Sequence, residues 1–270
     1  MLELVAITHY APTALEGLAG LKAAGARAFE IFFASPSHFD PTDAAQVEAV
    51  RAAILDSGMR PAVAHVSFGK DLALCEPDEG KRRAIVERHK LEFDVAQKLG
   101  VETVVVHPGS HRPEGHEPAA LRDYTREALL ELVATADDCG LKIALENMPP
   151  GHTGDTLEEM TDLVESLGTA TAGYCLDTGH AFLAGIDLGD MVRAFYPKLY
   201  AIHWQDNDGQ QDRHWIPGRG IIPWGPFFTA LDEVGFSGGV TVETGLWGML
   251  LSEFIRLGQK ALQERRAFYV

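Results

Sequence analysis

The feature that most restricts the fold is a unit that recurs along the chain: a helix-like segment, a glycine, and then a short apolar run. Glycine just past a helix end adopts the left-handed conformation that other residues resist. Each such glycine therefore predicts that a helix ends there and that the following run is a strand. The six glycines that precede such runs are Gly25, Gly58, Gly100, Gly140, Gly168 and Gly235.

Two further apolar runs, residues 2–7 and 198–204, bring the strand candidates to eight, all separated by helix candidates. The run at 103–106 is apolar on both sides, as expected where helices cover one face of a strand and a packed interior fills the other. Alternation throughout favours an eightfold barrel over an open doubly wound sheet. We predict one α/β domain over residues 1–270, a (β/α)8 TIM barrel, since such barrels commonly reach about 250 residues.

The helix candidates carry start signals and apolar stripes. Residues 78–99 place Ile85, His89 and Phe93 on one stripe at helical spacing. Asp43 and Asp78 stand where N-caps are expected, and Thr156, three residues before Glu159, predicts a capping box. These signals support helices between the predicted strands.

Composition and charge exclude several classes of protein. No run approaches the roughly 20 apolar residues that span a bilayer, and the start lacks a secretory pattern, so we expect a cytoplasmic protein with no membrane partner. The net charge of -16 disfavours nucleic acid, whose nonspecific binding depends on Lys and Arg. The three cysteines show no paired spacing, which suits a reducing compartment, and Cys175 is expected to fill space in the barrel interior.

Histidines and carboxylates stand at the end of one apolar run after another. The carboxyl ends of barrel strands meet at one mouth, so a closed barrel would bring these side chains together there, where we expect the active site. Six successive strand candidates, the third to the eighth, end in this way, and a further pair follows in the next loop. The nine predicted metal ligands are His65, His107, Glu146, Asp177, His180, His203, Asp212, His214 and Glu243.

This donor set indicates the kind of metal site. Imidazole with carboxylate and no thiolate suits zinc, manganese, iron or cobalt, and argues against a structural four-cysteine zinc site. Nine donors exceed the needs of one ion, so one to three ions per chain are expected, with zinc or manganese the leading candidates. Glu146 and Glu243 are expected to bridge ions through both carboxylate oxygens.

Several strings carry a family resemblance: HPGSH, LEN, LDTGHAF, IHWQDN, DRHWIPGRG and TVET. With them the chain resembles the xylose-isomerase-like barrel superfamily, which holds sugar and sugar-phosphate isomerases and epimerases beside the endonuclease IV group. The resemblance to the isomerases implies one divalent ion on Glu146, Asp177, His203 and Glu243. The resemblance to endonuclease IV implies three zinc ions and adds the remaining five ligands.

Three functions fit these residues. The preferred one is a sugar or sugar-phosphate isomerase or epimerase in which Glu146 and Glu243 are catalytic and move a proton beside a metal-polarised carbonyl. The alternative is an endonuclease IV-type zinc phosphodiesterase acting at abasic sites in DNA, which the full ligand set favours. Against it, the loop at 34–39 contains no arginine, and Gly69 follows Phe68 where a bulky wedge is expected. The third is a metal-binding barrel without turnover.

Other side chains near the predicted strand ends are candidates for substrate contacts. Aromatic rings there can stack on a sugar or a base, and arginines can hold an anionic group. The partner is expected to be a small carbohydrate, with nucleic acid disfavoured by charge and loops, and the sequence does not indicate an oligomeric state. The predicted substrate-binding residues are His9, Phe68, Trp204, Arg213, Trp215 and Arg219.

Overall fold

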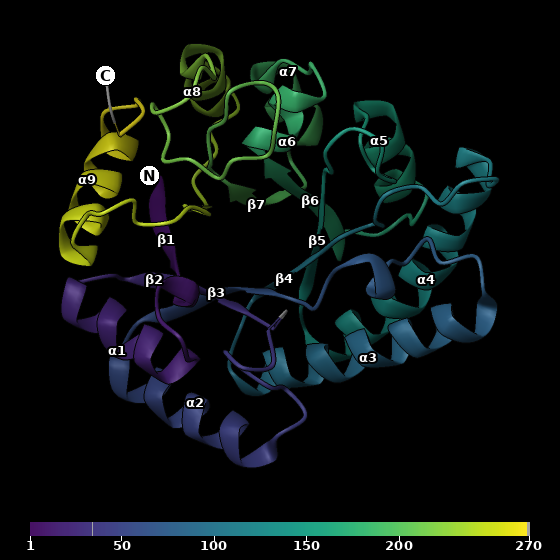
Figure 1. Ribbon diagram of the computed structural model, residues 1–270, viewed down its shortest axis with the longest axis horizontal. Helices are drawn as coiled ribbons and strands as arrows, with labels where there is room; N and C mark the ends of the chain where they lie inside the picture. The colour runs from purple at the N-terminus through teal and green to yellow at the C-terminus, as the bar shows by residue number, and fades with distance from the viewer. Residues whose placement is uncertain (34, 269–270) are drawn as a thin grey trace.

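The computed structural model describes residues 1–33 and 35–268, which form a closed barrel of eight parallel strands (Figure 1). The strands follow one another in chain order around the ring, and β1 closes it by pairing with β8. The predicted (β/α)8 barrel is therefore confirmed. The strands are β1 Glu3–Ile7, β2 Ala28–Phe32, β3 Arg60–His65, β4 Thr103–Val106, β5 Lys142–Glu146, β6 Ala172–Asp177, β7 Leu199–His203 and β8 Gly239–Thr241.

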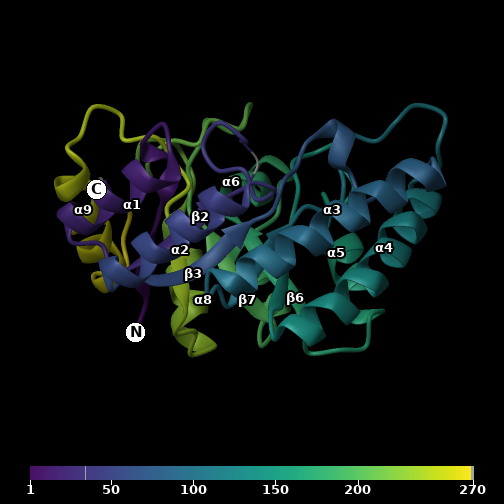
Figure 2. The ribbon, with the colours of Figure 1, turned by 90° about the horizontal axis from the view of Figure 1, so that it is seen from below.

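Helices surround the ring, and the loops that follow the strands project from the edge opposite the N-terminus (Figure 2). Two short helices, α6 and α7, fill the connection between β6 and β7. The helices are α1 Ala14–Ala24, α2 Ala44–Ser57, α3 Glu79–Lys98, α4 Pro118–Cys139, α5 Leu157–Glu165, α6 Thr178–Leu183, α7 Leu188–Phe195, α8 Trp224–Glu233 and α9 Leu251–Gln263, with single 3-10 turns η1 Thr8–Tyr10 and η2 Lys70–Leu72. None of the helices in the described part of the chain has the length and apolarity to cross a membrane.

The predicted helix ends and starts hold with one exception. All six glycines adopt positive φ angles, and Asp43 and Asp78 cap α2 and α3. The capping box at Thr156 is only half formed. Thr156 accepts from the backbone of Glu159, but the Glu159 carboxylate accepts from Arg112 and the Gly154 amide instead. The Glu159 carboxylate is buried beside the Arg112 guanidinium, and this ion pair replaces the second hydrogen bond of the capping box.

Small side chains fill the lower interior of the barrel, and larger ones pack between strands and helices. The inward layer includes Val5, Ala28, Ala144 and Ala201, and Cys175 belongs to it as predicted. This packed layer fills the interior and separates the mouth at the carboxyl ends of the strands from the opposite end of the barrel. The predicted donors stand at that mouth.

Candidate metal centre

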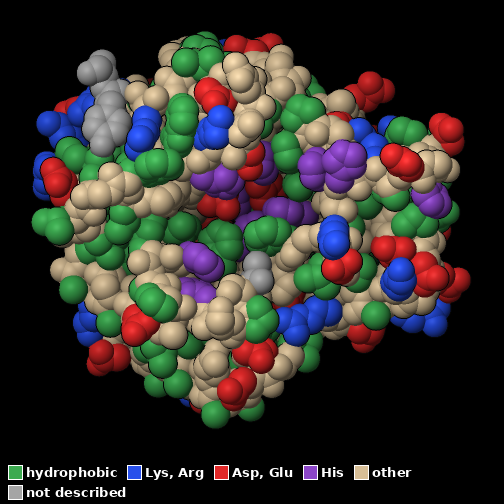
Figure 3. Space-filling view, in the orientation of Figure 1, with side chains coloured by type: hydrophobic (Ala, Val, Ile, Leu, Met, Phe, Trp, Pro, Cys, Tyr) green, Lys and Arg blue, Asp and Glu red, His purple; other side chains and the backbone are tan. Residues whose placement is uncertain are grey.

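All nine predicted ligands gather at the carboxyl ends of the strands, in a hollow where histidine and acidic side chains meet (Figure 3). Their donor atoms fall into three clusters, and within each cluster they lie within 4.8 Å of one another. The central cluster is Glu146, Asp177, His203 and Glu243; the first is His65, His107 and Glu146; the third is His180, Asp212 and His214.

The central cluster has the unsatisfied atoms that a metal ion would satisfy. Asp177 Oδ2, His203 Nδ1 and Glu243 Oε2 are buried and form no hydrogen bond. His203 Nδ1 lies only 3.1 Å from Glu243 Oε2, yet the two atoms are not aligned as donor and acceptor. Buried polar atoms are almost always paired. Atoms that converge without bonding one another fit ligands of a shared cation, so these residues fit a divalent ion.

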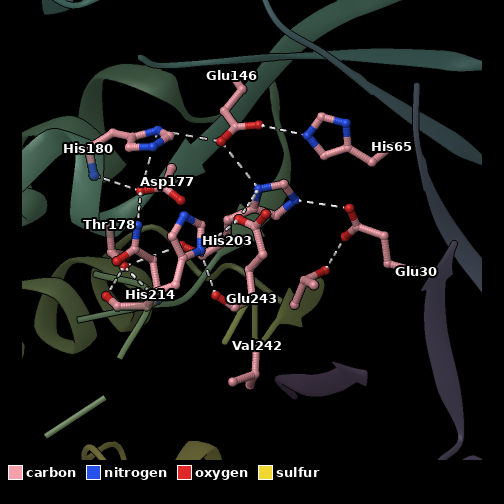
Figure 4. Close-up of polar contacts among 12 residues, drawn as sticks. Glu30, His65, Glu146, Asp177, Thr178, His180, His203, His214, Val242 and Glu243 are labelled. Atoms are coloured by element: carbon pink, nitrogen blue, oxygen red, sulfur yellow. Dashed lines mark hydrogen bonds and ion pairs between the residues drawn. The ribbon is translucent and has the colours of Figure 1, made fainter. Parts of the chain in front are cut away.

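Glu146 belongs to both the first and the central cluster (Figure 4). Its Oε2 lies 3.3 Å from His65 Nε2 and 3.1 Å from His107 Nε2, while Oε1 lies 3.4 Å from His203 Nδ1. The two oxygens thus face different clusters, the geometry of a bridging carboxylate. Glu243 was also predicted to bridge, but among the described residues it belongs to the central cluster alone.

The third cluster stands beside the central one and is tied to it by Gln205. The Gln205 amide donates to Asp177 Oδ1 at 3.2 Å and to Asp212 Oδ1 at 2.7 Å. Gly179 makes room for this amide, since a β-carbon there would lie 2.2 Å from it. His214 adopts a left-handed backbone with φ of 46°. Such strain in a residue other than glycine is concentrated at functional sites.

Four of the five histidines use one ring nitrogen to fix the ring and aim the other at a donor cluster. With the proton placed on the fixed nitrogen, Nδ1 donates to a backbone carbonyl in His65, His180 and His214, at 2.9 to 3.0 Å. His203 is reversed: Nε2 donates to Glu30 and Nδ1 faces the cluster. Metal-ligating histidines are held in this way, which sets the tautomer and the ring orientation.

Glu30 is a site residue that the sequence analysis missed. It is fully buried on β2 and accepts from His203 Nε2 at 3.2 Å and from the Thr241 hydroxyl at 2.7 Å. The signal was present, because a glutamate inside the apolar run FEIFF must find a buried partner. Asn147 was also missed; it links the ends of β5 and β6 by bonding the Asp177 amide and carbonyl.

Cys175 lies below the central cluster in the barrel interior. Its sulfur lies within 4.8 Å of donor atoms of Glu146 and His203, a position that the predicted ligand set did not include. Burial raises the pKa of its thiol far above the usual value.

The charges of the cluster shift one another's protonation. Burial raises the pKa of Asp177 to about 7, against the attraction of His180. Burial disfavours the charged form of His180, but Asp177 and Asp212 raise its pKa to about 10. Burial also opposes ionisation of Glu243, yet His203 holds its pKa at about 2. His203 and His107 likewise hold the pKa of Glu146 well below its usual value, so both glutamates are ionised at neutral pH.

A pocket of about 320 Å³ opens above the clusters, a volume typical of small-molecule sites. Glu146 and Glu243 both line it, together with Phe68, whose ring packs 4.6 Å from that of His107. Phe68 is held by the loop after β3, where Ser67 donates twice to the buried Glu92 of α3. His9 lines an adjoining pocket beside Phe68, so the structure places both predicted contacts at the mouth.

The remaining substrate candidates divide between rim and core. Arg219 lies 5.9 Å from the Trp215 ring and 4.0 Å from that of Trp247, and Arg213 pairs with Asp208. These side chains form the rim near His214 rather than the lining of the pocket.

The prediction that Trp204 contacts the substrate is wrong. The Trp204 side chain is fully buried and packs against Trp224, Phe228 and Phe268, away from the mouth. Neighbouring residues at the end of a strand point to opposite sides, so Trp204 points outward because His203 faces inward.

The loop after β2 contains no arginine, as the sequence analysis states, and Ala34 of that loop lies outside the described residues.

The chain is similar in sequence to proteins of two kinds. The chain is 35% identical over 191 residues to "Endonuclease 4" of Thermus thermophilus, covering 67% of this chain and 65% of that protein. It is 30% identical over 175 residues to "Inosose isomerase" of Bacillus velezensis, covering 62% and 61%. Each match thus covers less than two thirds of the relative's own length.

Solved structures show the same fold over nearly the whole chain. A "D-tagatose 3-epimerase-like protein" matches with a TM-score of 0.86 at 24% identity, covering 97% of both chains. The "IOLI protein with a binding zinc atom" matches with a TM-score of 0.82 at 22% identity, again over 97% of both. The sequence profile described as "Xylose isomerase-like TIM barrel" matches residues 18–254, and the chain belongs to that family.

Proposed function

We propose that the protein is a divalent-metal-dependent isomerase or epimerase of a small carbohydrate. One observation carries the proposal: Glu146 and Glu243 come from strands that are not neighbours, line the same pocket, and approach His203 Nδ1 at 3.4 and 3.1 Å. Proton transfer beside a carbonyl needs an ionised carboxylate as the base and a carboxyl group that can carry a proton back to the substrate.

The roles of the residues follow from their positions. Glu146, Asp177, His203 and Glu243 would hold zinc or manganese, which supplies polarisation of a carbonyl and its neighbouring hydroxyl. One ionised glutamate removes the proton from the carbon beside the carbonyl and, in an isomerisation, returns it to the former carbonyl carbon. In an epimerisation the other glutamate, once protonated from solvent, delivers a proton to the opposite face of the carbon that lost one. Glu30 keeps His203 in the required tautomer.

The comparisons and the charge support a carbohydrate. Among the proteins similar to this chain are one named for inosose isomerisation and one for a tagatose epimerase, and another holds zinc. The chain carries a net charge of -16, which repels the phosphates of DNA.

The test is deuterium exchange. Protein reconstituted with Mn²⁺ or Zn²⁺ is incubated in D2O with ketoses, inososes and ketose phosphates, and NMR follows loss of the proton beside the carbonyl. We expect exchange with at least one substrate, and Glu243→Gln should lower its rate by a factor of about 100 or more, because general acid-base catalysis contributes about 10² to 10⁴.

Metal content is measured in the same samples so that loss of catalysis is separated from loss of metal. Glu253→Gln, a change on the surface of α9, is the matched control and should exchange at the rate of the unaltered protein. Exchange that persists in a Glu243→Gln protein with full metal content would refute the glutamate-pair mechanism.

A second function has an observation of its own. The three donor clusters, two of which share Glu146, suit in-line displacement at a phosphodiester, where several metals stabilise the attacking and leaving oxygens. The similarity to Endonuclease 4 supports the same reading. If a zinc-loaded sample cleaves an abasic-site duplex and His107→Ala abolishes the cleavage, the phosphodiesterase replaces the isomerase as the proposed function.

A further inference from the structure

The pocket above the clusters continues into a second one of about 350 Å³. We call the first the metal lobe and the second, lined by His9, Tyr10 and Phe32, the aromatic lobe. Phe68, His214 and Glu243 line both. Glu146, His180 and Asp212 line only the metal lobe, so a reacting group belongs there and whatever is attached to it can extend past Glu243.

The hydroxyl groups of the aromatic lobe already have partners. The Tyr10 hydroxyl donates to the Val242 carbonyl at 3.1 Å, and the Thr244 hydroxyl donates to the Gly245 carbonyl at 3.1 Å. Ser35 is bonded to Ser37 at 3.0 Å. Apart from the His9 imidazole and the Glu243 carboxylate that it shares with the metal lobe, the lobe therefore offers mainly ring faces.

These rings are held in place by the metal centre. Phe32 stacks on His65 with 5.0 Å between ring centroids, and Phe68 packs 4.8 Å from the same imidazole. His9 meets the edge of Phe32 at 5.9 Å. Because His65 is a predicted ligand, the aromatic walls keep a fixed position relative to the reacting group.

We propose that the aromatic lobe binds a second ring joined to the reacting sugar, so that the substrate is a glycosylated sugar that still carries a carbonyl, either a ketoglycoside or a reducing disaccharide, rather than a free monosaccharide. This inference rests on the proposed function. A ring with an apolar face, whether a second sugar or an aryl group, stacks on aromatic side chains. Glu243 then stands at the junction of the two rings, facing the reacting unit.

The test measures binding to zinc-loaded protein by calorimetry, without requiring turnover. A set of methyl ketoglycosides, in which one ring hydroxyl is oxidised to a ketone, is compared with the matching phenyl ketoglycosides and with reducing disaccharides. We expect a phenyl glycoside or a disaccharide to bind at least about tenfold more tightly than its methyl counterpart, and which of the two does so identifies the second ring. Equal affinities, or no binding by any glycoside, would overturn the proposal.

Two serine variants make the test specific. Ser35→Trp should fill the aromatic lobe and abolish the preference for the second ring. Ser37→Trp is the matched control, because it loses the same Ser35 to Ser37 hydrogen bond at a position that does not line the lobe, and should keep the preference. Equal loss in both variants would refute the assignment.

The result also separates the two proposals. Second-ring preference in binding with no deuterium exchange on any sugar would leave the subsite standing and refute the isomerase. Deuterium exchange on free monosaccharides without any preference for a second ring in binding would support the isomerase and refute the subsite. A nucleoside monophosphate that binds more tightly than every glycoside would assign the lobe to a nucleobase and overturn the proposal.

Discussion

Single hydrogen bonds decide how the donors of this centre face one another. His203 is fully buried, and the Glu30 carboxylate accepts from its Nε2, which leaves Nδ1 to face the central cluster. Glu30 itself is held by the Thr241 hydroxyl on β8. It is therefore a positioning residue that acts on the metal through His203.

Glu30→Gln should weaken metal binding without unfolding the protein. A glutamine keeps the shape of the side chain, but its neutral amide makes the His203 imidazole a weaker ligand than the Glu30 carboxylate does. Loss of such outer partners lowers metal affinity about 10- to 100-fold. Zn²⁺ titration against a competing chelator measures the change. Glu102→Gln, at an exposed carboxylate, is the control. An affinity for zinc equal to that of the unaltered protein would contradict the role of Glu30.

Each barrel unit depends on the glycine at which its helix ends. Gly140 closes α4 with φ of 69° and has open space where a β-carbon would stand. The structure therefore requires glycine there for backbone conformation alone. The same requirement made these glycines visible in the sequence.

Gly140→Ala should lower the free energy of unfolding by about 1 to 2 kcal/mol, the cost of a left-handed conformation in a residue with a β-carbon. Urea denaturation measures the change. Gly225→Ala in the first turn of α8 is the matched control, since it also has open space but no positive φ, and should leave stability unchanged or slightly raised. Equal destabilisation by both changes would show that the left-handed conformation is not the cause.

The loops that carry the site are fixed by buried ion pairs and caps that no local pattern predicted. Arg112, after β4, pairs with Asp155 at 2.6 Å and with Glu159 at 2.8 Å, which joins the loops after β4 and β5. Asp206 accepts from the backbone amides of Gly218 and Gly220 and so shapes the loop that follows the third cluster. These partners lie 12 to 47 residues apart, beyond the reach of sequence periodicity.

Across the whole molecule, the closed ring concentrates charge that the metal-free protein must balance with protons. The pKa of His180 is raised from its ordinary 6.5 to about 10 by the surrounding carboxylates. The imidazolium therefore stabilises the fold fully below about pH 6.5, and this stabilisation is lost as pH rises through the folded value. Bound metal would displace this proton.

Metal-free protein should accordingly lose stability between pH 7 and pH 10, whereas zinc-loaded protein should change less. The midpoint of urea denaturation at several pH values measures both. His180→Gln should reduce the slope of the metal-free curve without removing it, because, against the effect of burial, Asp212 and Glu243 raise the pKa of His214 to about 11 and this group titrates over part of the same range. Parallel curves for the metal-free and zinc-loaded forms would contradict the expectation.

The sequence by itself determined the number of strands, their order along the chain, and which histidines and carboxylates stand at their carboxyl ends. It could do so because strand length, apolar runs and left-handed glycines are local properties of the chain. From them followed the barrel, and the barrel implied that the donors converge.

Only the tertiary structure decided how the donors divide. Strand stagger and side-chain direction depend on closure of the ring. They place Glu146 between two clusters and Glu243 in one cluster, and they direct the Trp204 side chain into the core. They also brought Glu30, from a strand with no predicted ligand, to His203, 173 residues away. Such neighbours are set by packing between segments that are distant in the sequence. The sequence pattern therefore predicts which residues are ligands but not which of them share a cluster.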